Sequence, residues 1–269
     1  MLSWKSKGTP PIAKVGKKLL YINHTKDDSS DSEDEHEIVK SLVEGSGISL
    51  KEKKKTKQGV LTEREYWAPK GQKLTPCLNI DKTQRIFVVG PTECGKSTLT
   101  SFYLKQFRKV FPKRRVLVYS QLDRDPAYDK YKIERADIED IPETTVDDLQ
   151  DSLVIFDDLD TVPDPNLMAH ISRLRNSCIQ IGRHKGVYSI FCGHTIFDGR
   201  ATGKMLRECS YVALFPQAGN KRHIHVYLAD HAGLDKEQEK KVLALKSRWI
   251  LVSSFAPIHI IHEDGMMIV

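Results

Sequence analysis

The chain has 269 residues and a formal net charge of +6, with 39% hydrophobic and 29% charged residues. This length is enough to bury a hydrophobic core without disulfides or a structural metal, and no apolar run approaches the roughly 18 residues of a membrane span. The excess of basic residues suits a phosphate-rich partner without requiring one.

The cysteines and the N-terminal residues indicate the cellular compartment in which the protein resides. The 5 Cys residues are scattered, and the first residues lack the apolar core of a secretory signal. No CxxC motif or paired Cys/His spacing is present, which argues against a zinc site. We therefore expect an intracellular protein with reduced thiols.

Residues 1–80 differ from the rest of the chain in composition and charge pattern, which predicts an accessory segment. Residues 17–22 have the composition of one short strand. A run of acidic residues and serines at 27–37 and a lysine-rich run at 51–57 follow. Like-charge runs are typical of disordered tails, so we expect this segment to be partly disordered. The acidic run could also be a phosphorylatable regulatory tail, and the basic run could contact DNA or direct nuclear targeting.

From residue 81 to 269, short apolar runs alternate with helix-like stretches. Asp164 is a good N-cap and Pro165 suits the first position of a helix. This alternation predicts an α/β domain with a mostly parallel sheet and helices on both faces. In chain order, we expect strands at 86–89, 115–119, 153–156, 187–191 and 211–215, helices at 97–110, 165–181 and 236–245, and terminal strands at 249–252 and 258–261.

The strongest motif lies between the first strand and the first helix of this domain. Residues 90–97 read GPTECGKS, which satisfies the P-loop pattern GxxxxGK[ST] in its strand–loop–helix context. The loop and the helix N-terminus direct backbone N–H groups at phosphate oxygens. We expect Lys96 to contact the β- and γ-phosphates of ATP and Ser97 to ligate Mg²⁺. The predicted nucleotide-binding residues are Gly90, Pro91, Thr92, Glu93, Cys94, Gly95, Lys96, Ser97 and Thr98.

A P-loop also requires an acidic residue at the end of a neighbouring strand, facing the metal. The buried strand at 153–156 is followed by Asp157 and Asp158. We expect Asp157 to hold Mg²⁺ and Asp158 to orient or deprotonate the attacking water. The alternative is that Asp158 only caps the following turn.

Hydrolysis also needs a group that contacts the γ-phosphate and a positive charge for the transition state. His194 follows the strand at 187–191 and is the candidate for the first role. Arg183 precedes that strand between two glycines and is the candidate arginine finger, reaching a neighbouring subunit. Arg173, Arg175 and Arg200 are rivals for that role.

The order of P-loop, Asp-Asp strand end, helix, Gly-Arg-His segment and polar-ended strand resembles the FtsK–HerA superfamily. Within it, residues 80–230 are most similar to viral genome-packaging ATPases of the poxvirus A32 type, which occur in large DNA viruses, virophages and polinton-like elements. The resemblance implies an additional-strand P-loop fold and a homo-oligomeric ring. It also implies ATP-driven translocation of double-stranded DNA into a preformed capsid, in the host cytoplasm or a viral factory, with possible association with the virion.

The sequence departs from this family at two positions. An amide is common where His194 stands, and Glu is common where Asp158 stands. For DNA contact, the basic residues 113–115 and 219–223 are the candidates, and each could also be plain surface.

Two other functions stay open. A P-loop kinase would phosphorylate a small molecule or nucleotide, and the basic residues after Gly199 could imitate its arginine-rich lid. The Asp157–Asp158 pair suits activation of water better than transfer to an acceptor. A non-enzymatic scaffold could bind nucleotide only to assemble, but the complete set of P-loop and acidic residues argues against it.

Overall fold

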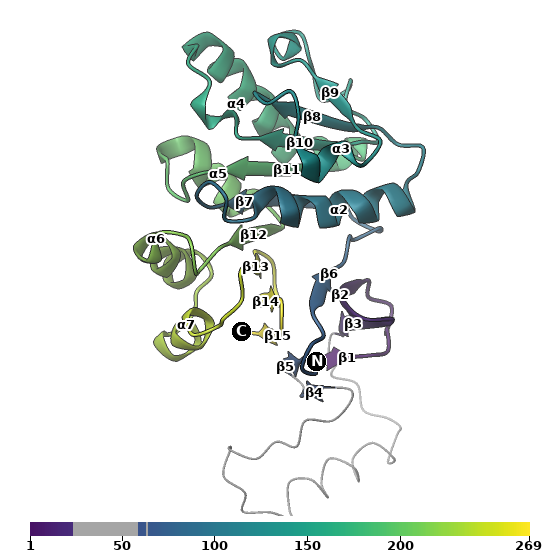
Figure 1. Ribbon diagram of the computed structural model, residues 1–269, viewed down its shortest axis with the longest axis vertical. Helices are drawn as coiled ribbons and strands as arrows, with labels where there is room; N and C mark the ends of the chain where they lie inside the picture. Colours follow the sequence, from purple (N-terminus) through teal and green to yellow (C-terminus); the bar gives the residue numbers. More distant parts are fainter. Residues whose placement is uncertain (24–58, 63) are drawn as a thin grey trace, which may run out of the picture.

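The computed structural model describes residues 1–23, 59–62 and 64–269, which are arranged around a large mixed β-sheet (Figure 1). Within this part of the chain, the large sheet has 11 strands in the order β4-β5-β15-β14-β13-β12-β7-β11-β10-β8-β9. A second, 4-stranded sheet of order β1-β3-β2-β6 lies near its antiparallel end (Figure 1). The acidic run at 27–37 and the basic run at 51–57 lie outside the described residues.

The bounds of the strands are as follows. The smaller sheet contains β1 (Leu2–Ser3), β2 (Pro11–Val15), β3 (Lys18–Ile22) and β6 (Leu74–Pro76). The large sheet contains β4 (Val60–Leu61), β5 (Glu65–Trp67), β7 (Arg85–Val89), β8 (Val116–Ser120), β9 (Glu134–Ala136), β10 (Leu153–Asp157), β11 (Tyr188–Gly193), β12 (Tyr211–Leu214), β13 (Ile250–Ser253), β14 (His259–His262) and β15 (Gly265–Ile268).

The α-helices are α2 (Lys96–Val110), α3 (Pro126–Asp129), α4 (Pro165–Gln180), α5 (Gly199–Glu208), α6 (Lys221–Val226) and α7 (Lys236–Leu243). Shorter helical turns are η1 (Ile138–Asp140), η2 (Leu159–Thr161), η3 (Gly182–Lys185) and η4 (Tyr227–His231). The side chain of Asp164 accepts a hydrogen bond from the backbone N–H of Asn166, and Pro165 opens α4, as the sequence predicts.

One half of the large sheet is parallel and the other half is antiparallel. The strands from β12 through β7, β11, β10 and β8 to β9 pair in parallel. Strand β11 is inserted between β7 and β10, so the strand before Asp157 is not the immediate neighbour of the strand before the P-loop. The sequence analysis expected a neighbouring strand, and the inserted strand corrects this. An additional strand here is what the FtsK–HerA resemblance implies.

Helices cover both faces of the parallel half because its strands are apolar on both sides. On one face, Ile86 and Val88 of β7 pack in a cluster with Leu99 and Tyr103 of α2. On the other face, the alternate residues Phe87 and Val89 pack in a cluster that contains residues of α4 and α5. The α/β class and the two helical layers are therefore confirmed.

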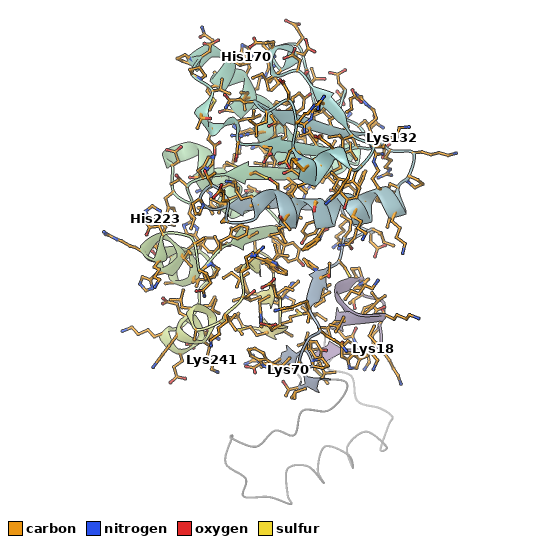
Figure 2. The ribbon with its side chains drawn as sticks, in the orientation of Figure 1. Lys18, Lys70, Lys132, His170, His223 and Lys241 are labelled. Atoms are coloured by element: carbon orange, nitrogen blue, oxygen red, sulfur yellow. The ribbon has the colours of Figure 1, made fainter. Side chains whose placement is uncertain are left out.

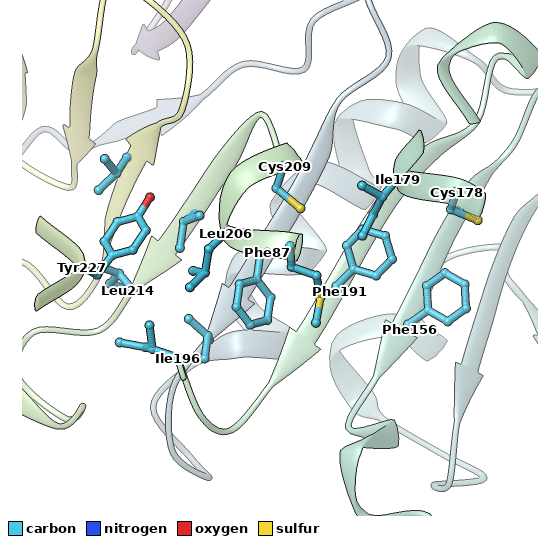
Figure 3. Packing of buried hydrophobic residues seen from close by; sticks show 14 of the residues in the cluster. Phe87, Phe156, Cys178, Ile179, Phe191, Ile196, Leu206, Cys209, Leu214 and Tyr227 are labelled. Atoms are coloured by element: carbon cyan, nitrogen blue, oxygen red, sulfur yellow. The ribbon is translucent and has the colours of Figure 1, made fainter. Parts of the chain in front are cut away.

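A row of aromatic rings packs on one face of the sheet, close to the carboxyl ends of the strands. Tyr119, Phe156 and Phe191 occupy paired positions on β8, β10 and β11. The rings of Tyr119 and Phe156 stack with centroids 5.5 Å apart, and those of Phe156 and Phe191 with centroids 5.4 Å apart. Figure 3 shows Phe156, Phe191 and Phe87 side by side under the sheet. Each residue of the row lies one or two positions before the end of its strand, so it fixes where the polar residues that follow can lie.

All of the strands and helices that the sequence predicts between residues 81 and 269 are present, with small shifts at their ends. The sequence did not predict the short strands and helices β9, β15, α3, α5 and α6. Among the described residues, no helix is both long enough and apolar enough to cross a membrane.

The N-terminal segment contributes to both sheets. The predicted strand at 17–22 is found as β3, but it pairs with β1 and β2, which the sequence did not predict. Strand β5 pairs with β15 near the end of the chain, and β4 pairs with β5. The large sheet therefore includes residues on both sides of residue 80. The division of the chain at that residue stays a prediction.

Two imidazoles are buried in β14, in the antiparallel half of the sheet. His259 is 6% exposed and His262 is 1% exposed. The Nδ1 of His259 donates to the Pro257 carbonyl at 2.8 Å, so its Nε2 accepts from the Tyr211 hydroxyl at 3.0 Å. Burial lowers the pKa of each imidazole from 6.5 to about 4. Both side chains are therefore held neutral in the folded protein.

We expect the free energy of unfolding to fall as the pH is lowered from about 6.5 to about 4. In this window the unfolded chain takes up a proton at each imidazole and the folded chain does not. A shift from 6.5 to about 4 corresponds to at most about 3 kcal/mol for each group. Urea unfolding of the wild type and of His259→Gln and His262→Gln at pH 7.5 and 5.0 measures this. Each variant should lose less stability between the two pH values than the wild type.

The matched control is His170→Gln, on the half-buried His170 of α4 (Figure 2). This variant should keep the pH dependence of the wild type. If removing either buried imidazole leaves the wild-type pH dependence unchanged, the two groups do not limit acid stability.

Candidate functional site

The candidate site lies at the carboxyl edge of the parallel half of the sheet. The P-loop follows β7, Asp157 is the last residue of β10, and His194 follows β11. Because parallel strands place their carboxyl ends at the same edge, residues distant in sequence meet there. The backbone N–H of Gly90 donates to the carbonyl of Gly193 at 3.1 Å, which ties the start of the P-loop to the end of β11.

The loop needs glycine at two positions for different reasons. A Cβ on Gly90 would lie 2.8 Å from the ring of Phe215, so no side chain fits there. Gly95 has φ of 109°, a conformation that disfavours other residues, and α2 begins at the next residue. Glu93 also has a positive φ of 65°. The chain therefore makes the tight turn that phosphate binding requires.

Lys96 holds a buried positive charge inside the loop and is only 6% exposed. Its Nζ donates to the carbonyl of Gly90 at 3.0 Å and lies 3.4 Å from that of Pro91. The same Nζ lies 3.5 Å from Oδ1 of Asp158 and 3.3 Å from Nδ1 of His194. The ammonium therefore joins the P-loop to both other strand ends.

The contacts of His194 define its tautomer. An ammonium can only donate, so Nδ1 of His194 accepts from Lys96. The Nε2 therefore carries the proton, and it lies 3.3 Å from Oδ1 of Asp158. Lys96, Asp158 and His194 form a closed triangle of polar contacts. The structure thus brings together three of the four residues that the sequence predicts as catalytic, and their roles stay predictions.

Asp157 is 3% exposed, and its Oδ1 has no hydrogen-bond partner among the described residues. Burial, followed by the charge of Asp158, raises the pKa of Asp157 from 3.8 to about 6. A buried carboxylate oxygen without a donor fits a hard cation, which would supply the missing positive charge. The residues present therefore fit Mg²⁺ held by Asp157 and by Ser97 at the start of α2. Both ligand assignments stay predictions.

The remaining predicted nucleotide-binding residues lie in the P-loop and in the first turn of α2, and their role in binding stays a prediction. Thr92, Glu93 and Thr98 are exposed, and Cys94 is buried beneath the loop. A cavity of about 150 Å³ adjoins the loop, lined by Pro91, His194 and His223 among others. His223 lies on α6 (Figure 2), within the basic segment 219–223 that the sequence offers as a DNA-contact candidate. That segment lies next to the nucleotide-binding loop.

Arg183 lies at the opposite edge of the sheet, in η3 just before β11. Its exposed side chain donates from Nε to His184 at 3.1 Å and lines a cleft of about 730 Å³. Lys82, Arg85 and Arg114 also line this cleft. The structure does not bring Arg183 to the P-loop of its own chain.

Two of the rival arginines are engaged within the fold. Arg173 donates from Nη2 to the carbonyl of Pro142 at 2.7 Å, and Arg175 is buried and paired with Asp160. Arg175 is therefore enclosed in the fold, whereas Arg173 stays exposed beside its carbonyl partner. Arg200 lies in α5, and its side chain is not among those described.

The sequence analysis missed Gln121, which lies beyond the end of β8 at the same edge. Its Nε2 donates to the carbonyl of Asp158 at 3.1 Å and to Oγ1 of Thr161 at 2.8 Å. A polar residue following a predicted parallel strand is a signal that could have found it. No comparable pattern in the sequence indicates that Arg175 of α4 pairs with Asp160 of η2.

Comparisons with known proteins identify the family. No protein-family profile matches the chain. The chain is 31% identical over 207 residues to "Uncharacterized protein V3" of Sputnik virophage, which covers 76% of this chain and 84% of that protein. This relative agrees with the resemblance to proteins of virophages and DNA viruses that the sequence predicts.

One solved structure shares the fold at lower identity, and another is similar to a lesser degree. The conjugation coupling protein TcpA of pCW3 matches with a TM-score of 0.50 and 12% identity, covering 81% of this chain and 68% of that one. The genome packaging NTPase B204 of Sulfolobus turreted icosahedral virus 2 has a TM-score of 0.45 and 14% identity, over 66% of this chain and 97% of that one. The motif, the inserted strand and the virophage relative lead to one assignment: the chain is a P-loop protein of the family to which V3 of Sputnik virophage belongs.

Proposed function

We propose that this protein is an ATP-driven translocase of double-stranded DNA that packages a viral genome into a preformed capsid inside the infected cell. The observation that carries the proposal is the triangle of Lys96, Asp158 and His194 beside Asp157, whose Oδ1 has no hydrogen-bond partner among the described residues. This arrangement has the parts that hydrolysis of ATP needs. The coupling to DNA and to a capsid rests on the resemblance of the sequence to packaging ATPases.

Each residue of the site has a task in this proposal. Lys96 exchanges its contacts within the loop for oxygens of the β- and γ-phosphates. Asp158 orients the attacking water and accepts its proton, and His194 holds Asp158 and contacts the γ-phosphate. Ser97 and Asp157 would hold Mg²⁺, which would supply positive charge beside the phosphates.

A kinase needs room for an acceptor and a lid that closes over it. The segment after Gly199, which could imitate a lid, is helix α5, whose Met205 and Leu206 are buried in the core cluster beneath the sheet. A helix anchored in this way favours a fixed wall over a moving lid. Hydrolysis is therefore better supported than phosphorylation of an acceptor.

Arg183 acts on the ATP of a neighbouring subunit in this proposal. It lies at the amino edge of the sheet, whereas the P-loop lies at the carboxyl edge. The cleft around it is lined by Lys82, Asp81, the buried Arg85 and Arg114, which is paired with Asp151, so Arg183 and Lys82 are its accessible cationic groups among the described residues. A ring in which the amino edge of one subunit meets the carboxyl edge of the next would bring Arg183 to that subunit's γ-phosphate.

The test of the function is the rate of ATP hydrolysis with and without double-stranded DNA. DNA should stimulate turnover whatever its sequence, and the stimulation should fall steeply with salt because the contacts are to phosphates. Lys96→Ala should fold and lose turnover, since no other residue of the loop carries a positive charge.

Three other results would contradict the proposed function or the proposed site. Turnover that ignores DNA, together with phosphate transfer to an added nucleotide, would identify a kinase. Nucleotide binding without turnover would identify a scaffold. Turnover retained by Lys96→Ala would show that hydrolysis takes place elsewhere.

We expect mutations of the two adjacent carboxylates, Asp157 and Asp158, to have different effects on nucleotide binding and on turnover. Asp157→Asn should weaken Mg²⁺-dependent nucleotide binding, whereas Asp158→Asn should keep binding and lose turnover. Because burial raises the pKa of Asp157 to about 6, protons should compete with the metal, so Mg²⁺ affinity should fall as the pH drops below about 6. Titration with Mg²⁺ and a fluorescent ATP analogue at pH 5.0 and 7.5 measures both effects. Equal loss of binding in the two variants would show that their roles are not divided.

Arg183 is tested by mixing two inactive variants. Arg183→Ala keeps its P-loop and Lys96→Ala keeps its arginine, so neither should hydrolyse ATP alone. Mixed rings should regain part of the activity, because some interfaces combine an intact loop with an intact arginine. Arginine fingers contribute roughly 10³-fold or more to turnover. Full activity of Arg183→Ala alone, or mixed rings that stay inactive, would exclude Arg183 from this role.

A further inference from the structure

An ion pair between the buried Arg175 and the partly exposed Asp160 lies directly behind the candidate site and has no role in the chemistry proposed above. Nη1 of Arg175 on α4 lies 2.9 Å from Oδ1 of Asp160 on η2. Arg175 is 5% exposed, and its guanidinium carbon lies 5.9 Å from the ring centroid of Phe156. Phe156, shown in Figure 3, directly precedes Asp157 on β10. The pair therefore contacts the strand that carries the acidic residues.

The second oxygen of Asp160 faces the end of β11. A Cβ on Gly193 would lie 2.8 Å from Oδ2 of Asp160, which is closer than real side chains approach. Gly193 directly precedes His194, and its carbonyl accepts from the N–H of Gly90 in the P-loop. Gly193 has no positive φ among the values described, so close approach is what requires glycine here. One carboxylate thus sits between α4 and the strand end that presents His194.

The same turn sets the direction of Asp158. Asp158 has φ of 50° and ψ of 39°, a left-handed conformation that costs free energy for a residue with a side chain. Two contacts hold the turn that follows: Gln121 binds the carbonyl of Asp158 and the hydroxyl of Thr161, and Arg175 binds Asp160. Unfavourable backbone conformations persist only when the surroundings enforce them. The ion pair is part of that enforcement.

Stability alone does not account for this pair. Nε and Nη2 of Arg175 are buried without hydrogen-bond partners among the described residues, so the guanidinium is only partly compensated. Buried ion pairs often contribute no more to stability than apolar groups of the same volume, because both charges lose their hydration. An apolar pair would not supply the directional contact that joins α4 to the turn after Asp158.

We propose that Asp160 and Arg175 are positioning residues that hold Asp158 and His194 at the distance from each other that hydrolysis requires. The contacts described for Asp160 and Arg175 do not include Lys96 or another residue of the P-loop, which reaches this pair only through Asp158 and the end of β11, so we expect nucleotide affinity to depend on the pair far less than kcat does. The inference rests on the proposed ATPase function. It predicts that loss of the pair lowers kcat and leaves nucleotide affinity in place.

The decisive variant replaces both charges together. Asp160→Asn with Arg175→Met keeps the approximate shapes and leaves no unpaired buried charge. We expect its urea midpoint and its affinity for a fluorescent ATP analogue to stay close to wild type. We expect kcat to fall about 10²-fold, the size of effect that a displacement of about 1 Å can have on a reacting group. A role in stability alone predicts the opposite pattern, with a lower midpoint and an unchanged kcat.

A matched control removes a different ion pair in the same way. Lys73 and Asp264 lie 2.6 Å apart on the surface of the antiparallel half of the molecule. Lys73→Met with Asp264→Asn should leave kcat and affinity unchanged.

A second variant tests the same contact from the strand side. Gly193→Ala places a Cβ against Oδ2 of Asp160 without altering any charge. It should give the same fall in kcat with nucleotide affinity retained, and it carries the test if the double variant does not fold. If folded Gly193→Ala or the folded double variant turns over like the wild type, the positioning role is wrong while the ATPase function stands. If the wild type itself neither binds nor hydrolyses ATP, the proposed function fails instead.

Discussion

The buried positive charge of Lys96 is the constraint on which the rest of the site depends. An ammonium that is only 6% exposed must be compensated by charge or hydrogen bonds, because water cannot solvate it. Its partners come from three separate segments: the P-loop carbonyls, Asp158 and His194. The chain can bring these together only if β7, β10 and β11 run parallel and end at the same edge. The buried apolar strands and the aromatic row beneath them provide that alignment.

Inserting β11 between β7 and β10 changes how the site is assembled. The acidic residues are moved one strand further from the P-loop, and His194 is placed between them. Contacts that cross the inserted strand then become necessary. The hydrogen bond from Gly90 to Gly193 joins it to the P-loop, and the close approach of Asp160 to Gly193 joins it to the acidic turn. An extra strand therefore places His194 beside the P-loop and makes its position depend on the neighbours on both sides.

The sequence predicts those parts of the structure that are set locally. The P-loop, the strand before Asp157 and the capped start of α4 each follow from short-range patterns, and the structure contains all three. Strand order depends on non-local pairing, so the separation of β10 from β7 did not follow from the residue patterns and was expected only from the family resemblance. Strands as short as β4 and β5 carry too few residues for a pattern, and the pairing of β5 with β15 spans most of the chain. The Asp160–Arg175 pair was missed because Arg175 looks like any helix arginine until α4 is packed on the sheet.

The charges at the carboxyl edge explain why a site of this kind gains from a neighbouring subunit. Two adjacent carboxylates and one ammonium leave an excess of negative charge, which is why the pKa of Asp157 is raised by burial and by Asp158. In the proposed function, ATP would bring more negative charge than one divalent cation neutralises, and Lys96 would leave Asp158 to reach it. The transition state would then benefit from another cation delivered at the moment of hydrolysis. Arg183 lies at the far edge of its own sheet, so in the proposed ring it would serve another copy of the chain. Under that proposal, separating the cation from its own P-loop would make hydrolysis depend on the position of the next subunit, which is what a motor that moves along DNA requires.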